Sequence, residues 1–375
     1  MTGSADATTA LAHTPLHALH EELGGRMVAF AGHALPVQYP SGIMSEHRHT
    51  RDACSLFDVS HMGQLRLPVA AAGALEALVP TDVLGLASGR QRYTFLTTDD
   101  GGILDDLMVA RLDDALIIVC NAANKAADVA HLEARLGAGA GLRVLDDRAL
   151  LALQGPGAET ALAALAPGAA GMRFMDVAEL DVGGHTCVVS RSGYTGEDGY
   201  EISVAADAAI ALARALLARE GVAPAGLGAR DSLRLEAGLC LHGHDIDTTT
   251  SPVEAGLTWA IPRVRRAGGA RAGGFAGSEV VLGQIAGGTS RRRVGIRPAG
   301  RAPVREGAVV VGTDGAEIGR VTSGGFGPTV RAPVAMGYVA ADHAADGSEL
   351  GAVVRGETLP AVVAPLPFVA HRYRR

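Results

Sequence analysis

The sequence contains few aromatic residues, one lysine and four cysteines among its 375 residues. Aromatic side chains make up 4% of the chain, and Lys125 is its only lysine, so arginine supplies almost all the positive charge. Successive cysteines stand more than fifty residues apart, at Cys54, Cys120, Cys187 and Cys240, and no Cys-x-x-Cys motif occurs. This spacing argues against a zinc ribbon and a thioredoxin-type motif. It predicts buried free thiols rather than a disulfide framework.

Long apolar runs and targeting signals are also missing. No apolar run reaches the ~18 residues of a membrane-spanning helix, so we expect no membrane partner. Residues 1–13 contain no arginine and no basic segment before an apolar core, which argues against both a transit peptide and a signal peptide. We therefore expect a disordered leader over residues 1–13 and a cytoplasmic protein.

The acidic charge balance and the missing nucleotide motifs narrow the function further. The formal net charge is −7 with no dominant basic stripe, so a nucleic-acid partner is not expected. Neither a Walker A motif nor a Gly-x-Gly-x-x-G after an early strand occurs, which argues against nucleotide and flavin cofactors. Two histidine pairs, His47 with His49 and His242 with His244, have a spacing at which side chains do not face each other on a helix. We therefore predict no metal site.

The pattern of apolar residues predicts an α+β protein with a small all-β region at its end. Hydrophobic residues make up 48% of the chain, enough for a sizeable core, and the length suits two or three domains. Two apolar runs around Asp100-Gly101 predict a β-hairpin over 93–109. Arginine, glycine and alanine are enriched in 263–293, which we interpret as a linker region between a large region over 14–262 and short β-like runs over 294–375.

Two adjacent carboxylates interrupt the second apolar run of this hairpin. In a strand, Asp105 and Asp106 point to opposite faces, and both faces otherwise carry apolar residues. At least one carboxylate should therefore be partly buried, which raises its pKa and suits a general base or a charge stabiliser. The structural alternative is a strand-end aspartate bonded to a nearby turn. The alternation of side chains along a strand does not show which of the two aspartates is the functional one.

A polar loop with three glycines, over 192–202, and an arginine further along the chain are the other candidates. Glu201 stands where the loop enters a strand, so its carboxylate can accept two N–H donors of a heterocycle. Arg230, near the start of a helical pattern over 228–238, has the fork geometry that grips a ligand carboxylate. The alternatives are an ordinary hairpin with a surface glutamate and a structural Arg-Asp pair.

Eight segments, in a fixed order along the chain, carry a resemblance to a known family. They are PVQYPSGI (36–43), FDVSHMGQ (57–64), GGILDDLMV (101–109), LQGP (153–156), SGYTGEDGYEI (192–202), ARDSLRLEA (229–237), SPVEAGL (251–257) and TSGGFGP (322–328). Each segment is only moderately specific, but the ordered set closely resembles the aminomethyltransferase, or T-protein, of the glycine cleavage system.

The resemblance implies a folate-binding fold of three domains, arranged as a cloverleaf around a central hole. Residues 14–262 would form two interleaved α+β subdomains, and residues 294–375 a small C-terminal β-barrel domain. It implies an enzyme that moves the methylene carbon of an aminomethyl group from lipoyl-bearing H-protein to tetrahydrofolate, giving 5,10-methylenetetrahydrofolate and ammonia. The implied partners are H-protein and tetrahydrofolate as co-substrate, with no metal, nucleotide or flavin.

Matched position by position, the resemblance implies a role for particular residues. Asp106, the second residue of the pair, would be the catalytic carboxylate beside the folate nitrogens, and Glu201 would hold the edge of the pterin. Arg230 falls at a further position of the folate site. The other residues implied to line or reach the folate pocket are Met62, Tyr93, Met108, Tyr194, Trp259, Arg372 and Tyr373.

Related activities and one local departure qualify this assignment. A tetrahydrofolate-dependent demethylase of another small donor and a non-catalytic folate-binding module are the alternatives, and the retained Asp106 argues against the second. Gly32-His33-Ala34 stands where the family usually has Gly-Trp-Glu, so one aromatic ring and one charge are lost. We expect this departure to concern H-protein docking and local stability rather than the chemistry.

Overall fold

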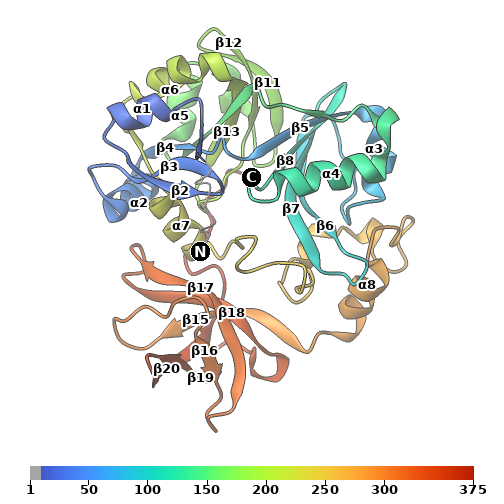
Figure 1. Ribbon diagram of the computed structural model, residues 1–375, viewed down its shortest axis with the longest axis vertical. Coiled ribbons are helices and arrows are strands. Elements are labelled where there is room, and N and C mark those ends of the chain that lie inside the picture. The colour runs from blue at the N-terminus through green and yellow to red at the C-terminus, as the bar shows by residue number, and fades with distance from the viewer. Residues whose placement is uncertain (1–9) are drawn as a thin grey trace, which may run out of the picture.

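The computed structural model describes residues 10–375 and arranges them in three lobes (Figure 1). The first lobe holds a six-stranded sheet and a small three-stranded sheet, and the second holds a five-stranded sheet. The third lobe, orange to red, is a closed six-stranded barrel. The α+β class and the C-terminal barrel predicted from the sequence are therefore confirmed.

The first lobe is built on a sheet with the order β11-β12-β13-β10-β4-β14, in which only the β14–β4 pair is parallel. Apolar side chains from helices α1, α5 and α6 pack with this sheet in one large core cluster. A small sheet of order β1-β3-β2 belongs to the same lobe. The strands are β1 (Ala12–His13), β2 (Arg26–Phe30), β3 (His33–Gln38), β4 (Cys54–Asp58), β10 (Arg148–Gln154), β11 (Val177–Val182), β12 (His185–Ser190), β13 (Gly199–Ala205) and β14 (Val222–Pro224). The helices are α1 (His17–Glu22), α2 (Ile43–Asp52), α5 (Ala158–Ala163) and α6 (Ala209–Leu217).

The second lobe is a sheet with the order β6-β7-β8-β5-β9, inserted in the chain between β4 and β10. Helix α4 covers it through Leu132, which is buried with Leu107 and Val109 of β7. Alternate residues of β7 therefore face this core, as the period of a strand requires. The elements are β5 (Gly63–Pro68), β6 (Arg90–Thr97), β7 (Ile103–Arg111), β8 (Ala115–Cys120), β9 (Arg143–Val144), α3 (Ala72–Glu76) and α4 (Lys125–Leu136).

The third lobe closes on itself with the strand order β15-β18-β17-β16-β19-β20. Helix α7 (Leu227–Glu236) contacts both β17 and β18 and also packs on α2 and β3, so it joins the barrel to the first lobe. The barrel strands are β15 (Arg291–Pro298), β16 (Val309–Val311), β17 (Glu317–Gly327), β18 (Ala332–Ala340), β19 (Glu349–Val354) and β20 (Glu357–Ala364).

The segment 263–293, which composition predicts as a linker, contains helix α8 (Ser278–Gly287) and is packed against the hairpin of the second lobe. Phe275 and Val281 are buried in one cluster with Phe95 of β6. The hairpin turn approaches so closely that a Cβ on Gly277 would lie 2.4 Å from backbone atoms at Gly101. The segment is therefore packed on the second lobe through buried apolar side chains, and it does not form the linker that its glycine and arginine content predicts.

The start of the chain also differs in part from its prediction. A disordered leader was expected over residues 1–13. Residues 1–9 of it lie outside the described residues. Ala12–His13 is ordered, because it forms β1 and pairs in parallel with β3. All four cysteines are buried and free, as their spacing predicts. Over residues 10–375, none of the helices combines the length and the apolar character needed to cross a membrane.

Candidate active site

The carboxylates of Asp105 and Asp106 lie near the start of β7, beyond the point where its neighbour β8 ends. Asp105 is fully buried, whereas Asp106 on the other face keeps partial exposure. Cross-strand pairing sets Phe95 opposite Asp106 and Tyr93 opposite Met108, so these four side chains share one face of the sheet. The face that carries Asp106 therefore also carries two of the residues expected to line the folate pocket.

The surroundings of Asp106 make its carboxyl unusually easy to protonate. Burial and the neighbouring charge of Asp105 raise the pKa of Asp106 to about 6, against opposing effects of His242 and of hydrogen bonds from Tyr93 and Asn121. A carboxyl with this pKa is ionised at neutral pH and still accepts a proton more readily than a surface carboxylate. Both properties suit a group that exchanges a proton with a substrate or stabilises a cation.

Two asparagines after β8 organise the carboxylate pair. Asn121 Nδ2 donates to Oδ1 of Asp105 and to Oδ1 of Asp106, each at 2.8 Å, and the Asn121 backbone N–H donates to Asp105 Oδ2 at 3.0 Å. Asn124 Nδ2 donates to Asp105 Oδ1 at 2.8 Å and lies 2.8 Å from His242 Nδ1. The sequence reasoning missed both asparagines and considered His242 only as a metal ligand. The signal was present: two amides directly follow a buried apolar strand.

Trp259 is the most exposed of the expected pocket residues. Its side chain is 61% exposed, although a lone tryptophan is more often a core residue. The indole stacks on Tyr93, with ring centroids 5.3 Å apart, and Tyr93 in turn packs edge-on against Phe95 at 5.6 Å. An exposed aromatic surface therefore lies directly beside Asp106, which suits a ligand with a flat ring.

A second cluster of polar side chains surrounds Arg230. Arg230 lies near the start of α7, and its neighbours come from the 192–202 loop. The guanidinium lies over the Tyr194 ring, 4.8 Å from its centroid, and its Nη1 is buried with no hydrogen-bond partner among residues 10–375. Burial lowers the pKa of Arg230, whereas the charge of Glu201 raises it, so the two groups lie within electrostatic range. Ser192 donates to Glu201 Oε2 at 2.8 Å. An unsatisfied buried donor beside a carboxylate suits a polar ligand that completes the hydrogen bonds.

Tyr194 connects the two polar groups. Burial raises the pKa of its phenol above the usual range, and the charges of both Asp106 and Arg230 act on it. The hydroxyl donates to the backbone carbonyl of Cys240. The structure thus brings Asp106, Tyr93, Trp259, Tyr194 and Arg230 into one neighbourhood, with Glu201 in electrostatic range of Arg230.

The remaining candidates lie at the margins of this neighbourhood. Met62 is half-buried against the cluster that includes Leu233 of α7. Arg372 donates its backbone N–H to Gly196 at 2.8 Å and pairs with Glu197 at 3.1 Å. The Tyr373 ring stacks on Phe174 at 4.1 Å. The tail therefore rests on the same loop that carries Tyr194.

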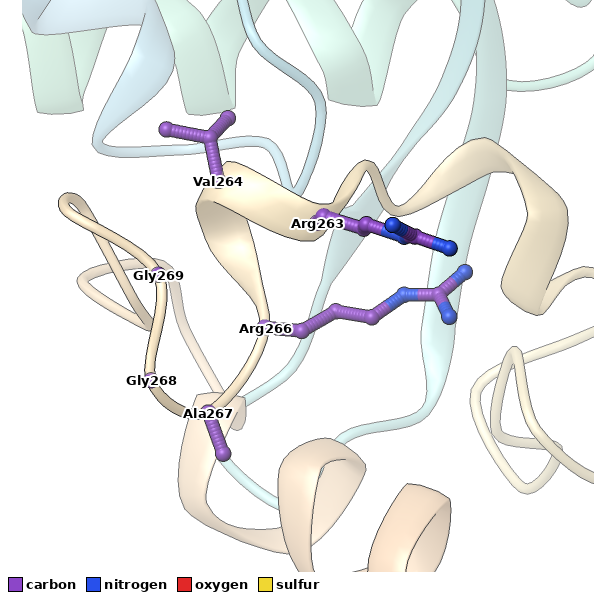
Figure 2. Close-up of a pocket in the computed structure, with 6 residues that line it drawn as sticks. All are labelled: Arg263, Val264, Arg266, Ala267, Gly268 and Gly269. Atoms are coloured by element: carbon purple, nitrogen blue, oxygen red, sulfur yellow. The ribbon is translucent and has the colours of Figure 1, made fainter.

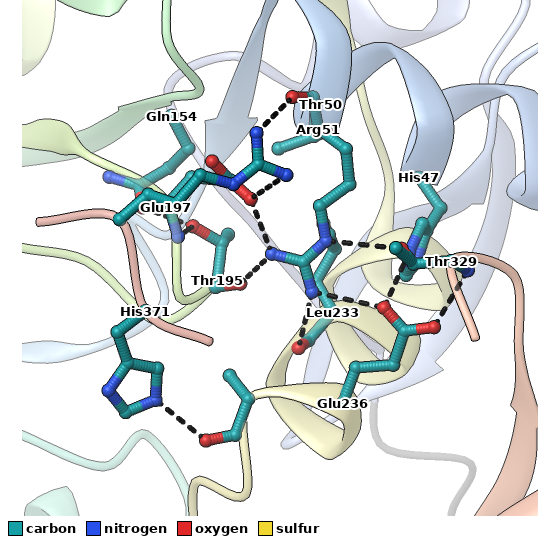
Figure 3. A network of polar contacts seen from close by, with 12 residues as sticks. His47, Thr50, Arg51, Gln154, Thr195, Glu197, Leu233, Glu236, Thr329 and His371 are labelled. Carbon is teal, nitrogen blue, oxygen red and sulfur yellow. Dashed lines mark hydrogen bonds and ion pairs between the residues drawn. The ribbon is translucent and has the colours of Figure 1, made fainter. Parts of the chain in front are cut away.

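A buried network of charges holds this loop and the barrel on the first lobe (Figure 3). Arg51 of α2 pairs with Glu197 at 2.8 Å and with Glu236 of α7 at 3.1 Å. His47 joins Glu236 to Thr329 of the barrel. Burial would raise the pKa of Glu236, but the hydrogen bond and charge of His47 and the donors at Thr329 and Val330 lower it to about 2. Glu236 is therefore ionised at neutral pH, and Arg51 connects it to Glu197 of the loop.

A hollow at the loop between Arg263 and Gly269 is shallow and open, and it holds none of the candidate residues. Figure 2 shows the side chains of Arg263 and Arg266 pointing the same way, with their guanidinium groups close together. Arg266 is anchored by hydrogen bonds to the carbonyls of Thr258 and Ile261, at 2.6 and 2.7 Å, whereas Arg263 is exposed. This cationic surface borders Trp259 and lies outside the candidate active site.

Comparisons with known proteins cover nearly the whole chain. Residues 16–264 match the family model described as GCVT N-terminal domain, and residues 291–370 match the glycine cleavage T-protein C-terminal barrel domain. The mitochondrial aminomethyltransferase of Homo sapiens is 44% identical over 98% of this chain and 92% of its own length. That of Dictyostelium discoideum is 39% identical over 97% and 94%. The crystal structure of glycine cleavage system aminomethyltransferase T from Bartonella henselae is 44% identical and matches with a TM-score of 0.91, covering 97% of this chain and 100% of that one.

Proposed function

The chain belongs to the aminomethyltransferase family of glycine cleavage T-proteins and is an enzyme of that class, and we propose that the site around Asp106 carries its chemistry. In this reaction the methylene carbon of the aminomethyl group on a lipoyl sulfur of H-protein passes to tetrahydrofolate. The products are 5,10-methylenetetrahydrofolate, ammonia and reduced H-protein. The observation that carries the proposal is the partly exposed, readily protonated carboxylate of Asp106 beside an exposed aromatic stack.

Asp106 would act on the reacting groups through charge and through its proton. The carbon that moves must meet a folate nitrogen while ammonia leaves, so positive charge develops on carbon and nitrogen. An ionised carboxylate in a partly dry site stabilises that charge more strongly than one in water. Its raised pKa also lets it take the proton that the attacking nitrogen releases. Asn121 keeps the carboxylate oriented during both steps.

Glu201 and Arg230 would hold the folate heterocycle at the far end of the site. A carboxylate that accepts two N–H groups from a planar ring fixes both the orientation and the register of that ring. Arg230 offers the unsatisfied Nη1, and burial makes each bond to it stronger. Tyr93, Met108, Met62, Tyr194 and Trp259 would supply apolar and aromatic surface between this end and Asp106, and Arg372 and Tyr373 would close the rim.

H-protein is the proposed macromolecular partner. Its lipoyl arm must reach Asp106 from outside, so we expect docking on the surface near Trp259, where Arg263 and Arg266 present positive charge. We also propose a cytoplasmic location. The relatives compared above carry the word mitochondrial in their names, so this location stays a prediction.

The test is a coupled assay with purified enzyme, tetrahydrofolate and H-protein loaded with the aminomethyl group. Ammonia and methylenetetrahydrofolate should appear in equal amounts, and only when both substrates are present. If folate binds but neither product forms, the donor is a different molecule, and a demethylase or a folate-binding module becomes the better assignment.

A further inference from the structure

Met175 has a left-handed backbone, with a φ of 70°. This conformation is unfavourable for any residue with a Cβ atom, and a long side chain in it marks backbone strain. Among residues 10–375, the other non-glycine residues with positive φ are Ala31, Arg331 and Arg355, and each lies in a turn between two paired antiparallel strands. Such turns commonly require positive φ. The strands before and after Met175, β10 and β11, are not neighbours in their sheet, so a different constraint holds this residue.

The two peptide groups that flank Met175 are bonded to different lobes. Its N–H donates to the carbonyl of Arg191 in the first lobe at 2.9 Å. Its own carbonyl accepts the N–H of Gln91, in β6 of the second lobe, at 3.0 Å. The φ and ψ angles of a residue set the angle between its two flanking peptide groups, because each peptide group is planar. The left-handed backbone of Met175 therefore determines how these two segments face each other.

Phe174 attaches the C-terminal tail at the same point. Its N–H donates to the carbonyl of Arg374 at 2.7 Å, and its ring stacks on Tyr373 with the centroids 4.1 Å apart and the planes at 4°. Arg374 also pairs with Glu159 of α5. Phe174 and Met175 thus form a joint at which β6, the start of the 192–202 loop and the tail are all held by backbone hydrogen bonds.

Each of the three segments held at this joint carries a tyrosine that is expected to line or reach the folate pocket. Tyr93 lies two residues after the N–H donor in β6, so both share one face of the strand. Tyr194 lies three residues after the carbonyl acceptor in the first lobe, and Tyr373 directly precedes the acceptor in the tail. A change of backbone angle at the joint would therefore move the three rings relative to one another.

We propose that Met175 is a positioning residue whose left-handed backbone sets the mutual placement of the three tyrosines around folate. The proposal rests on the proposed function, because it requires folate to bind among these rings. Backbone strain persists only where the surrounding structure over-determines the conformation, and it is typical of sites that hold a ligand. The hydrogen bonds of the joint to three separate segments supply that constraint.

The first experiment separates the backbone of Met175 from its side chain. Glycine adopts the left-handed conformation without strain and asparagine tolerates it, whereas β-branched valine does not. Met175→Gly and Met175→Asn should bind tetrahydrofolate with a Kd within about twofold of wild type, and Met175→Val should bind it about tenfold more weakly. The titration uses the full-length enzyme at a temperature where circular dichroism shows every variant folded. Equal weakening in the glycine and valine variants, or none in the valine variant, would overturn the proposal.

Arg355→Val is the matched control. Arg355 has a φ of 54° in the exposed turn between β19 and β20, so valine strains the backbone there in the same way, in a turn that carries none of the candidate residues. This variant should have a lower melting temperature and an unchanged Kd for folate. If Arg355→Val weakens folate binding as much as Met175→Val does, the effect is general instability and the proposal is wrong.

Limited digestion with trypsin tests the joint without substrate. Trypsin cleaves after arginine, and the tail offers Arg372 and Arg374, which are both held by contacts to the first lobe. Cleavage in the tail, followed by intact mass, should be faster in Met175→Val than in wild type, Met175→Gly or Arg355→Val. Equal rates would overturn the proposal. If wild-type enzyme binds no folate, the proposed function fails and the positioning role fails with it, whereas faster cleavage in Met175→Val would still show that the joint holds the tail.

Discussion

The side-chain nitrogen of Asn121 lies 2.8 Å from the Oδ1 atom of Asp106, and the same nitrogen lies 2.8 Å from Oδ1 of Asp105. One amide thus ties together two carboxylates that point to opposite faces of β7. The arrangement requires the end of β8 and the start of α4 to meet the start of β7. It fixes the orientation of Asp106 before any substrate arrives, which is the condition for electrostatic catalysis.

Replacement of Asp106 by asparagine should abolish most turnover. Asparagine keeps the shape and an oxygen acceptor for Asn121 but neither carries charge nor accepts a proton, so we expect a loss of about 10²- to 10⁴-fold in kcat. Folate binding and the fold should be retained, as measured by fluorescence titration and circular dichroism. Near-normal turnover in this variant would remove Asp106 from the catalytic role.

The same substitution should stabilise the protein in a pH-dependent way. The pKa of Asp106 is raised from 3.8 to about 6 in the folded state, so the fold binds this proton more tightly than the unfolded chain. Stability is therefore lost as pH rises between these two values. Asp106→Asn, which is permanently neutral, should gain more in melting temperature over wild type at pH 7.5 than at pH 5. Equal gains at both pH values would contradict the raised pKa.

Replacement of Glu201 by alanine should weaken folate binding. A lost charge-assisted hydrogen bond costs about 1.5–3 kcal/mol, which corresponds to roughly a 10- to 100-fold increase in Kd. Glu220, which is exposed after α6, offers a matched control for removal of one negative charge. If the Kd of Glu201→Ala equals that of Glu220→Ala, Glu201 is not in the folate site.

Removal of Arg51 should destabilise the whole enzyme. Arg51→Met leaves the buried carboxylates of Glu197 and Glu236 without their shared partner, and breaking such a pair costs about 3–5 kcal/mol. Urea unfolding measures this loss. Arg214→Met, which breaks an exposed pair with Glu22, should have little effect. Similar unfolding midpoints for the two variants would show that the network does not stabilise the fold.

The apparent affinity for H-protein should fall as salt concentration rises. Exposed charges near a docking surface act mainly on the association rate. Salt screens them over about 8–10 Å at physiological ionic strength. Arg263→Glu should lower the affinity and flatten the salt dependence. Arg143→Glu is the control. Arg143 is exposed on β9, and β9 and β6 form the two opposite edges of the five-stranded sheet, so Arg143 lies far from the proposed docking surface. Salt independence in the wild type would argue against electrostatic docking.

Local patterns in the sequence were enough for the class of the fold and for the candidate carboxylates. The Asp100-Gly101 turn, the alternation of β7 and the short β-like runs after residue 293 all depend on neighbouring residues, and the structure contains each of them. The two-residue period of a strand also placed Asp105 and Asp106 on opposite faces of the sheet. The same local reasoning read 263–293 as a linker, because it registers glycine and arginine but not the burial of Phe275 and Val281 against a distant hairpin.

Strand period and turn chemistry act between near neighbours, so the amino-acid sequence alone is enough to predict an α+β region followed by a β-barrel, and two carboxylates in an apolar strand. The folded structure adds that Asp105 is buried under two asparagines, and that Asp106 lies beside Tyr93, on which the exposed Trp259 stacks. Burial, charge and hydrogen bonding at these residues come from segments far apart in the chain, and no local pattern encodes which of those segments meet.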